Sequence, residues 1–198
     1  RNVPMFGGYK FNPNDDYENE KKINWVSIEE QLTSVEHLIK AGKVKFFALS
    51  NEWPWGLMEF IRLAKVKNLP LVCTLQNSYN LLNRIVELGM TEIFFRENLS
   101  FFSYSPLAFG HLSGKYLKDP NAVGRVNLFP GYAQRYKRNG VNKAIEKYDA
   151  LAKRRNISLA DLALSFVYKQ WFVTSTVIGA TNIKQLKQNI SAYDLDII

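Results

Sequence analysis

The sequence predicts an α/β fold in which short buried strands alternate with helices. Short and almost wholly apolar runs recur along the chain, and each ends at a small or polar cluster. Segments in which apolar residues recur at helical spacing lie between these runs. Strands that are apolar on both faces are typical of parallel sheets covered by helices, so the alternation favours a parallel sheet with both faces buried.

The composition is that of a globular protein. Of the 198 residues, 46% are hydrophobic, 22% charged and 14% aromatic, which excludes disordered, collagen-like and coiled-coil chains. No run approaches the roughly 18 apolar residues of a membrane helix, so membrane insertion is not expected. Residues 1–10 lack the apolar stretch of a signal peptide, and we therefore expect a cytoplasmic protein.

The first regular element is predicted to begin near Ser27. Residues 1–24 show no hydrophobic period and are expected to form a loop or an insertion. Ser27 starts a capping-box pattern, and apolar residues then recur at helical spacing until Gly42 ends the helix. A second helix is expected over residues 57–66, following Pro54.

Four apolar runs are predicted as strands, and they cover residues 44–49, 71–75, 101–104 and 174–178. The first three runs start 27 and 30 residues apart, which is the length of one strand–helix unit. The longer gap before the fourth run holds two more helices. One is expected over residues 141–154, and the other starts at Ser158 with a second capping pattern.

The number of strands favours part of a barrel. A (β/α)8 barrel needs eight strands and roughly 250 residues, whereas four strand–helix units are predicted here. A doubly wound sheet could be complete with four or five strands, but no Gly-x-Gly-x-x-Gly follows any of them. We therefore expect about the second half of a (β/α)8 TIM barrel, as a single partial domain. Its parts are a loop or insertion (1–24), three helix/strand units (25–110), a long loop (111–140), and the C-terminal helices with the last strand (141–198).

The net charge is concentrated in one segment. The chain carries 26 Lys and Arg against 18 Asp and Glu, a formal charge of +8, and residues 115–155 hold eleven basic and three acidic residues. Such a segment suits a phosphate-bearing ligand or nucleic acid, or forms a solubilising surface. No RRM, KH, zinc-finger or helix-turn-helix signature accompanies it, and aromatic residues are not interleaved with the lysines, so nucleic acid is not an expected partner.

The candidate site residues follow the predicted strands, because ligands gather at the carboxyl ends of parallel strands. These ends carry amides, hydroxyls and one aromatic ring, in the groups Ser50-Asn51, Gln76-Asn77, Tyr104-Ser105-Pro106-Leu107 and Gly179-Ala180-Thr181. They contain no acid pair and no Ser-His-Asp set. Groups of this kind hold and orient a ligand rather than attack it.

The cysteine and the histidines predict neither a disulfide nor a metal centre. Cys73 is the single cysteine, and it lies in an apolar run, so we expect a small core residue. With only His37 and His111 beside it, no set of metal ligands can be drawn. We therefore expect a site without metal.

Two of the strand ends continue into longer motifs. Residues 104–116 (YSPLAFGHLSGKY) place an aromatic residue, a Pro-braced turn, two glycines and a lysine in succession. Residues 177–189 (VIGATNIKQLKQN) form a strand, a glycine turn and a helix. Backbone N–H groups and the helix dipole at the start of such a helix attract a phosphate. The polar residues around one side of this helix are Thr181, Gln185, Gln188 and Asn189.

The ordered succession FFALSN, LQNSYNLLNR, YSPLAFGHLSGKY and VIGATNIKQLKQN resembles the aldo-keto reductases. The resemblance is to the branch shared by bacterial Tas-like proteins and the potassium-channel β subunits, and it covers about residues 27–195. It implies the second half of a (β/α)8 barrel that binds NADPH (NADP+) without a Rossmann fold. It also accounts for the missing glycine fingerprint.

Residue by residue, the resemblance assigns Ser50, Asn51 and Gln76 to the nicotinamide carboxamide. Tyr104 is expected to stack on the nicotinamide ring and to fix which face delivers hydride. The residues expected to run under the pyrophosphate are Ser105, Pro106, Leu107, Ala108 and Phe109.

The resemblance implies further contacts for the phosphates and the adenosine. Lys115 is expected to pair with phosphate, and Arg125 to lie near the phosphates and the adenosine end. Both belong to residues 111–140, which are expected to form a cofactor-covering loop. The residues expected at the adenosine end are Gly179, Thr181, Gln185, Gln188 and Asn189. Where the channel-subunit pattern has Ser and Glu, this chain has Thr181 and Gln188.

The resemblance places catalysis elsewhere. Family members reduce carbonyl compounds with a tyrosine as general acid, helped by lysine, aspartate and histidine on the first four strands. The histidine motif would end immediately before Arg1, and neither His37 nor His111 matches it. We therefore expect no catalytic residue in this chain, which alone would bind cofactor without reducing the small carbonyl substrate of the full-length enzyme.

Less specific interpretations stand beside these. Tyr104 could be a core aromatic, Lys115 a solvated lysine, and Ser50-Asn51 a turn and helix cap. The amides of the last helix could be ordinary surface residues. For the chain as a whole, one alternative is a non-catalytic NADPH-sensing regulatory subunit resembling the channel β subunits. Another is a truncated product that self-associates through the open edge of a half-barrel.

Overall fold

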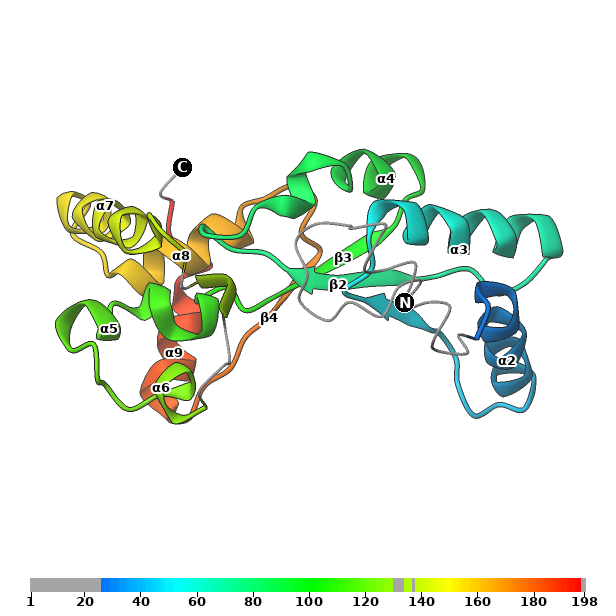
Figure 1. The fold of residues 1–198 in the computed structure, drawn as a ribbon, viewed down its shortest axis with the longest axis horizontal. Helices are drawn as coiled ribbons and strands as arrows, with labels where there is room; N and C mark the ends of the chain where they lie inside the picture. Colours follow the sequence, from blue (N-terminus) through cyan, green and yellow to red (C-terminus); the bar gives the residue numbers. More distant parts are fainter. Residues whose placement is uncertain (1–25, 130–133, 137, 197–198) are drawn as a thin grey trace. The chain divides into compact units, whose positions relative to one another are not determined.

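The computed structural model describes residues 26–129, 134–136 and 138–196 (Figure 1). The predicted loop or insertion over residues 1–24 lies outside the described residues. Contacts within the chain divide it into two units. The first contains the residues up to Asn77 and Gly89–Phe101, and the second contains Ser78–Leu88 and the residues from Phe102 onward.

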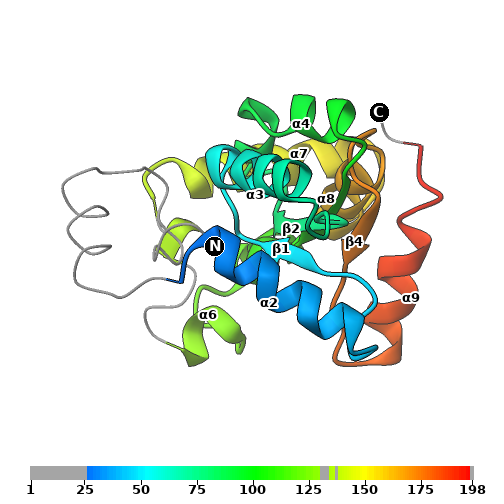
Figure 2. The same ribbon diagram turned by 90° about the vertical axis from the view of Figure 1, so that its right-hand side faces the viewer.

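The first unit is built from two helices, a parallel strand pair and a short helix. Its elements are α2 (Ile28–Lys40), β1 (Ala48–Ser50), α3 (Pro54–Lys67), the start of β2 (Thr74–Ser78), α4 (Thr91–Arg96) and the start of β3 (Ser100–Tyr104). β1 pairs in parallel with β2, and α2 packs against α3. Figure 2 shows α3 lying along one side of β1 and β2.

Capping and apolar burial explain the helices of the first unit. The Ser27 hydroxyl accepts a hydrogen bond from the N–H of Glu30 and so begins α2 as predicted. Pro54 occupies the first turn of α3, where its missing N–H costs nothing. The buried face of α3 then forms the core together with Leu75 of β2, through Leu57, Phe60, Ile61 and Ala64. The rings of Phe94 and Phe101 stack beside it at 5.0 Å.

The second unit contains the remaining helices and the second strand pair. Its elements are η1 (Ile85–Leu88), η2 (Ala108–Ser113), α5 (Lys115–Lys118), α6 (Arg125–Leu128), η3 (Gln134–Tyr136), α7 (Val141–Arg154), α8 (Leu159–Tyr168), β4 (Ser175–Val177) and α9 (Ile183–Ser191). β3 pairs in parallel with β4, with Tyr104 opposite Val177. The Tyr79 N–H, directly after β2, donates to the Tyr104 carbonyl at the end of β3. The strand order is β1-β2-β3-β4.

α8 is the central helix of the second unit. A capping box between Ser158 and Asp161 begins it, as the sequence predicts. α7, η2, α9 and β4 all contact α8. Its buried side chains join Ala108 and Leu112 of η2 and Ile145 of α7 in one apolar cluster. Burial of such side chains stabilises by roughly 1.5–3 kcal/mol each.

Several predicted strand bounds are wrong. The predicted strand over 44–49 is β1, Ala48–Ser50, and Phe46 before it is 76% exposed. The predicted strand over 71–75 is β2, Thr74–Ser78, which continues through three polar residues. The last two strands match more closely, at Ser100–Tyr104 and Ser175–Val177.

The expectation that every strand is buried on both faces is also wrong. In β1 only Leu49 is buried, and β4 has no buried residue. Each of these strands has a single strand partner among the described residues. Cys73, expected in the core, is exposed, and its thiol donates to the Phe47 carbonyl at 2.9 Å.

Candidate cofactor-binding site

The ends of β1 and β2 bring three predicted site residues together in the first unit. Ser50 lies opposite Gln76 in the parallel register, and the Asn51 N–H donates to the Gln76 carbonyl at 3.0 Å. Asn51 has a left-handed backbone with φ of 57°, and its amide donates to the Ser50 hydroxyl at 3.0 Å. The arrangement presents an amide and a hydroxyl side by side at one strand end.

Two further residues support this strand end: Asn77, which belongs to the predicted group Gln76-Asn77, and Glu52, which sequence reasoning did not single out. The Asn77 amide donates to the Glu52 carbonyl at 2.9 Å, and so joins the end of β2 to the residue after Asn51. Glu52 is 1% exposed, and its carboxylate accepts from the Trp53 N–H at 2.9 Å, where α3 begins. The sequence signal available for Glu52 was an acidic residue just before the start of a helix, because a carboxylate there satisfies free N–H groups.

In the second unit, β3 ends in a turn with an unusual backbone. Ser105, Ala108 and Phe109 have φ values of 55°, 48° and 57°, and Gly110 follows with 97°. Such values cost energy in residues other than glycine and persist where surrounding contacts enforce them. The Ala108 N–H donates to the Ser105 carbonyl at 2.9 Å, and the Gly110 N–H to the Leu107 carbonyl at 2.8 Å. We call residues 105–110 the left-handed turn.

Lys115 lies against two glycines beside the left-handed turn. Its ammonium donates to the Val123 carbonyl at 3.2 Å and lies 4.8 Å from the centre of the Tyr116 ring. A Cβ on Gly110 would come within 3.3 Å of Lys115 Cε, and a Cβ on Gly124 would overlap Lys115 Nζ and the Tyr116 hydroxyl. The two glycines therefore make the room that the ammonium occupies.

Arg125 is the second cation beside this turn. Its guanidinium carbon lies 5.8 Å from the centre of the Phe109 ring, within the range of a cation–π contact. Arg125 is exposed and begins α6, and both α5 and α6 contact η2. The second unit thus brings Lys115 and Arg125 to the left-handed turn.

The polar residues of the last motif are already engaged within the second unit. The Thr181 N–H and hydroxyl both donate to Gln185 Oε1, at 2.9 and 3.0 Å. Asn189 is 4% exposed, and its amide donates to the Gly179 carbonyl at 3.1 Å. Asn189 therefore holds the turn between β4 and α9. Thr181 and Gln185 remain exposed, so they can still contact a ligand.

Gln188 is bound to the start of α8. Its amide donates to the Ser158 hydroxyl and to Asp161 Oδ1, both at 3.0 Å. These two acceptors belong to the capping box of α8. The arrangement gives Gln188 a role in holding α9 that the sequence pattern did not predict.

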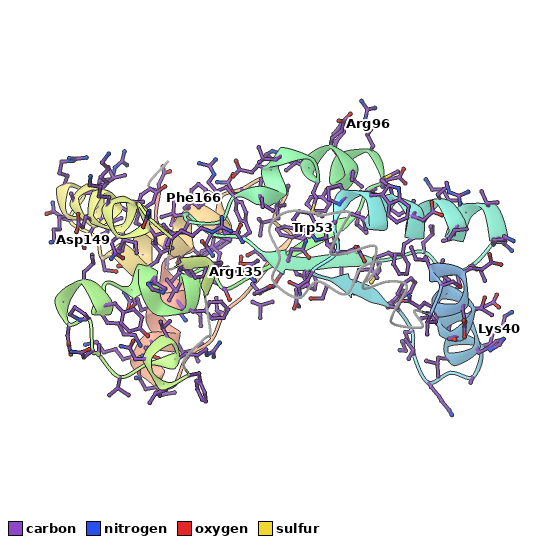
Figure 3. The ribbon with its side chains drawn as sticks, in the orientation of Figure 1. Lys40, Trp53, Arg96, Arg135, Asp149 and Phe166 are labelled. Carbon is purple, nitrogen blue, oxygen red and sulfur yellow. The ribbon has the colours of Figure 1, made fainter. Side chains whose placement is uncertain are left out.

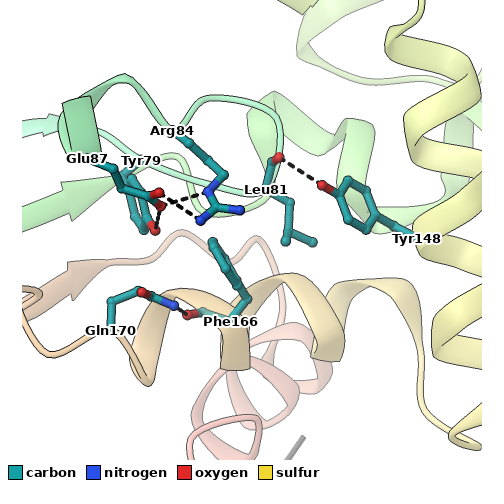
Figure 4. A network of polar contacts seen from close by, with 7 residues as sticks. All are labelled: Tyr79, Leu81, Arg84, Glu87, Tyr148, Phe166 and Gln170. Atoms are coloured by element: carbon teal, nitrogen blue, oxygen red, sulfur yellow. Dashed lines mark hydrogen bonds and ion pairs between the residues drawn. The ribbon is translucent and has the colours of Figure 1, made fainter. Parts of the chain in front are cut away.

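A polar cluster follows β2 in the second unit (Figure 4). The Tyr79 hydroxyl donates to Glu87, and Arg84 donates to both oxygens of the same carboxylate at 2.7 Å. Arg84 also lies over the Phe166 ring at 5.2 Å. Burial raises the Tyr79 pKa, and the bond to Glu87 raises it further, which keeps the phenol protonated. For Glu87, burial acts against ionisation, but the bonds from Arg84 and Tyr79 prevail and lower its pKa.

The basic residues of α7 face solvent. Lys143 and Lys147 are exposed, and Lys153 pairs with Asp149, labelled in Figure 3, at 2.6 Å. A solvated helix face accounts for these lysines. Within the described ranges, no three His, Cys, Asp or Glu side chains group as metal ligands. None of the helices described is both long and apolar enough to cross a membrane.

Comparisons with known proteins relate the chain to one family. A profile described as "Aldo/keto reductase family" matches residues 11–197. "Protein tas" of Escherichia coli (strain K12) is 38% identical over 172 residues, 87% of this chain and 50% of that protein. An "Aldo-keto reductase" of Babesia bovis is 39% identical over 197 residues, 96% of this chain and 69% of that protein.

A further relative is more distant. "L-glyceraldehyde 3-phosphate reductase" of Escherichia coli (strain K12) is 29% identical over 170 residues, 83% of this chain and 49% of that protein. The chain therefore spans about half the length of both Escherichia coli relatives.

Proposed function

Because the chain belongs to the aldo/keto reductase family, we propose that it is the NADPH-binding portion of an enzyme that reduces aldehydes or ketones to alcohols. The observation that carries the proposal is the left-handed turn with Lys115 and Arg125 beside it. Two cations next to a backbone turn suit a ligand with several phosphates. NADPH, when bound, supplies the hydride.

The residues present fit such a cofactor. Lys115 has three N–H donors, one of which the Val123 carbonyl takes, so the ammonium retains capacity for phosphate oxygens. The absence of side chains at Gly110 and Gly124 lets the ammonium lie beside the left-handed turn. Arg125, exposed and always charged, is the group we assign to the 2′-phosphate that distinguishes NADPH from NADH.

The strand ends would hold the nicotinamide. Ser50, Asn51 and Gln76 offer hydroxyl and amide groups, which match the donor and acceptor of a carboxamide. Tyr104, at the end of β3, would stack on the nicotinamide ring. Thr181 and Gln185 would contact the adenosine, while Gln188 and Asn189 hold α9 in position.

The proposal assigns cofactor binding to this chain and acid–base catalysis to other residues of the enzyme. Tyr79 does not match a proton donor, because its pKa is raised and its hydroxyl is bonded to Glu87. A small carbonyl compound is the proposed substrate class, and the cytoplasm the proposed location.

A titration of the chain with NADPH, and with NADH in parallel, followed by tryptophan fluorescence, tests the proposal. Saturable binding that favours NADPH is expected. Lys115→Ala should weaken binding of both cofactors, whereas Arg125→Ala should reduce the preference for NADPH. A lack of binding to the chain would overturn the assignment of a formed cofactor site. Equal losses for NADPH and NADH in Arg125→Ala would overturn the 2′-phosphate contact.

We further propose that the chain self-associates, and we assign the contact to the exposed apolar face of α9 rather than to the open strand edge expected from the sequence. Ile183, Leu186 and Ile190 recur at helical spacing and are 68%, 39% and 59% exposed, and Tyr193 beyond them is 61% exposed. Exposed apolar helix faces often mark surfaces against which another molecule packs. We assign a second copy of the chain to this face, because a symmetric dimer pairs identical surfaces.

A further inference from the structure

Asn80 is the most completely bonded side chain next to the left-handed turn. It is fully buried and directly follows Tyr79. Its amide nitrogen donates to the Ser105 carbonyl and to the Tyr136 hydroxyl, both at 2.9 Å. Its amide oxygen accepts from the Leu82 N–H at 2.9 Å. Both N–H donors and the oxygen are therefore used inside the protein.

Ser105 begins the left-handed turn, and its carbonyl is held from two directions. The Ala108 N–H closes the turn at 2.9 Å, and the Asn80 amide reaches the same oxygen from the segment after β2. A backbone with φ of 55° at a serine needs such outside support. Asn80 supplies this support. If the turn opened, the buried Asn80 amide would lose its partner on Ser105, which costs free energy.

Tyr136 holds the other side of the same turn. It is 2% exposed, and its ring lies 5.9 Å from that of Phe109 and 5.6 Å from that of His111. Its hydroxyl accepts from Asn80 and lies 3.5 Å from the Ser78 hydroxyl. Phe109, against which the Tyr136 ring packs, also carries the Arg125 guanidinium. Asn80 and Tyr136 thus fix both the backbone of the turn and the ring beside the cation.

We propose that Asn80 and Tyr136 form a positioning pair for the dinucleotide cofactor. The inference rests on the proposed function. The pair holds the left-handed turn in the shape that receives the pyrophosphate, and keeps Tyr104, the residue before the turn, oriented for the nicotinamide ring. Neither residue contacts the cofactor itself. The adenosine end, held by Thr181 and Gln185, does not depend on the pair.

Asn80→Asp is the sharpest test, since it keeps the shape of the side chain and removes both donated hydrogen bonds. Asn83→Asp is the matched control. It makes the same change three residues later in the segment after β2, at a buried residue whose amide donates to the Ser78 carbonyl at 3.3 Å. Tyr136→Phe removes only the hydroxyl and leaves the ring packed. Each variant is titrated with NADPH and with adenosine, which lacks the nicotinamide, the pyrophosphate and the 2′-phosphate that we assign to Arg125.

The positioning role predicts a split between the two ligands. Asn80→Asp should weaken NADPH binding by about tenfold or more and Tyr136→Phe by about threefold, with adenosine bound as in the wild type. A variant that merely loosens the fold would lose both ligands equally, and that result would overturn the proposal. So would an Asn83→Asp chain that loses as much NADPH affinity as Asn80→Asp.

Hydrogen exchange separates this inference from the proposed function. The Ala108 and Gly110 amides close the left-handed turn, and they should exchange faster in Asn80→Asp and Tyr136→Phe but not in Asn83→Asp. Unchanged exchange would overturn the pair whatever the chain binds. Faster exchange in a chain that binds no NADPH would overturn the proposed function and the assignment of the pair to a cofactor, while the turn-holding contact stands.

Discussion

The Gln188 amide donates a 3.0 Å hydrogen bond to the carboxylate of Asp161, and this bond joins α9 to the start of α8. The same amide also reaches the Ser158 hydroxyl. An amide is the group that can donate to both acceptors at once. The contact explains why a glutamine suits this position, where the channel-subunit pattern resembled by this chain has an acid.

Gln188→Glu should therefore destabilise the chain. The new carboxylate would lose both donated hydrogen bonds and would face Asp161 as a like charge, at a cost of about 1–3 kcal/mol at neutral pH. The free energy of unfolding by urea measures the loss. The variant should recover stability relative to the wild type as the pH falls and one of the two acids takes up a proton. The double variant with Asp161→Asn serves as the control, and an equal loss there would contradict the repulsion.

Glu87 should make the free energy of unfolding depend on pH in the acidic range. Its folded pKa lies below the ordinary value of 4.5, so its contribution is present above that pH and lost as the pH falls through the lowered pKa. Glu87→Gln should cost about 1 kcal/mol at neutral pH, since the group is partly exposed, and the difference from the wild type should shrink below pH 4.5. Urea unfolding at a series of pH values measures this. Glu92→Gln, in an exposed pair with Arg96, is the control.

Tyr168 should make the free energy of unfolding depend on pH in the alkaline range. Burial raises its pKa from 10.0 to about 12, and its hydroxyl donates to the Asn189 carbonyl at 2.9 Å. A raised folded pKa means that the contribution is intact below pH 10 and is lost as the pH rises towards 12. Tyr168→Phe should lower the free energy of unfolding by about 1 kcal/mol at neutral pH. In the variant this free energy should fall less steeply than in the wild type as the pH rises above 10. Identical alkaline unfolding curves for variant and wild type would contradict the prediction.

Gly124→Ala should weaken NADPH binding without unfolding the chain. The added Cβ would overlap the Lys115 ammonium and the Tyr116 hydroxyl, both of which lie at the far ends of their side chains and would have to move away. We expect the dissociation constant for NADPH to rise about tenfold, with a smaller dependence on salt, because the displaced cation no longer meets the phosphate. Gly89→Ala is the matched control, since its Cβ would make only an ordinary contact of 3.8 Å with Pro54.

Ile190→Glu should abolish self-association through α9. A charge on the exposed apolar face would be buried against a second copy, so the dimer dissociation constant should rise at least about tenfold. Sedimentation over a range of concentrations measures it. Lys184→Glu, on a polar position of the same helix, is the control. A wild-type chain that remains a monomer at all concentrations would overturn the self-association.

The helices were predictable because their signals are local. The helix expected over residues 141–154 is α7, Val141–Arg154, and the capping pattern at Ser158 is present in full. Short helices escaped prediction. α4 has six residues, too few to show a period, and η2 is interrupted by left-handed residues at Phe109 and Gly110.

Strand ends were less predictable, because the apolar run does not mark them. β2 continues through Gln76, Asn77 and Ser78, and the side chains of Asn77 and Ser78 hydrogen-bond within the protein. Conversely, Phe46 belongs to an apolar run and yet lies outside β1 and largely exposed. Backbone pairing with the neighbouring strand, which no single segment encodes, sets these bounds.

The candidate site likewise contains features that local sequence motifs predict and features that they do not. The pairing of Asn51 with Gln76 and the closeness of Lys115 to the turn follow from motifs at the ends of predicted strands, whereas Arg125 was expected there from the family resemblance alone. The Asn80–Tyr136 contact joins residues 56 positions apart, and no spacing in the sequence predicts it. The roles assigned to these residues in binding a cofactor stay predictions.

The border between the two units crosses the chain three times, after Asn77, Leu88 and Phe101. Neither unit is therefore one continuous stretch of polypeptide, and no single cut in the gene isolates either of them. A product that ends at Phe101 would carry residues 78–88 without the later residues against which they fold, including Ser105 and Tyr136. Dissecting this protein calls for point substitutions, or for splitting and reassembling the chain at more than one junction.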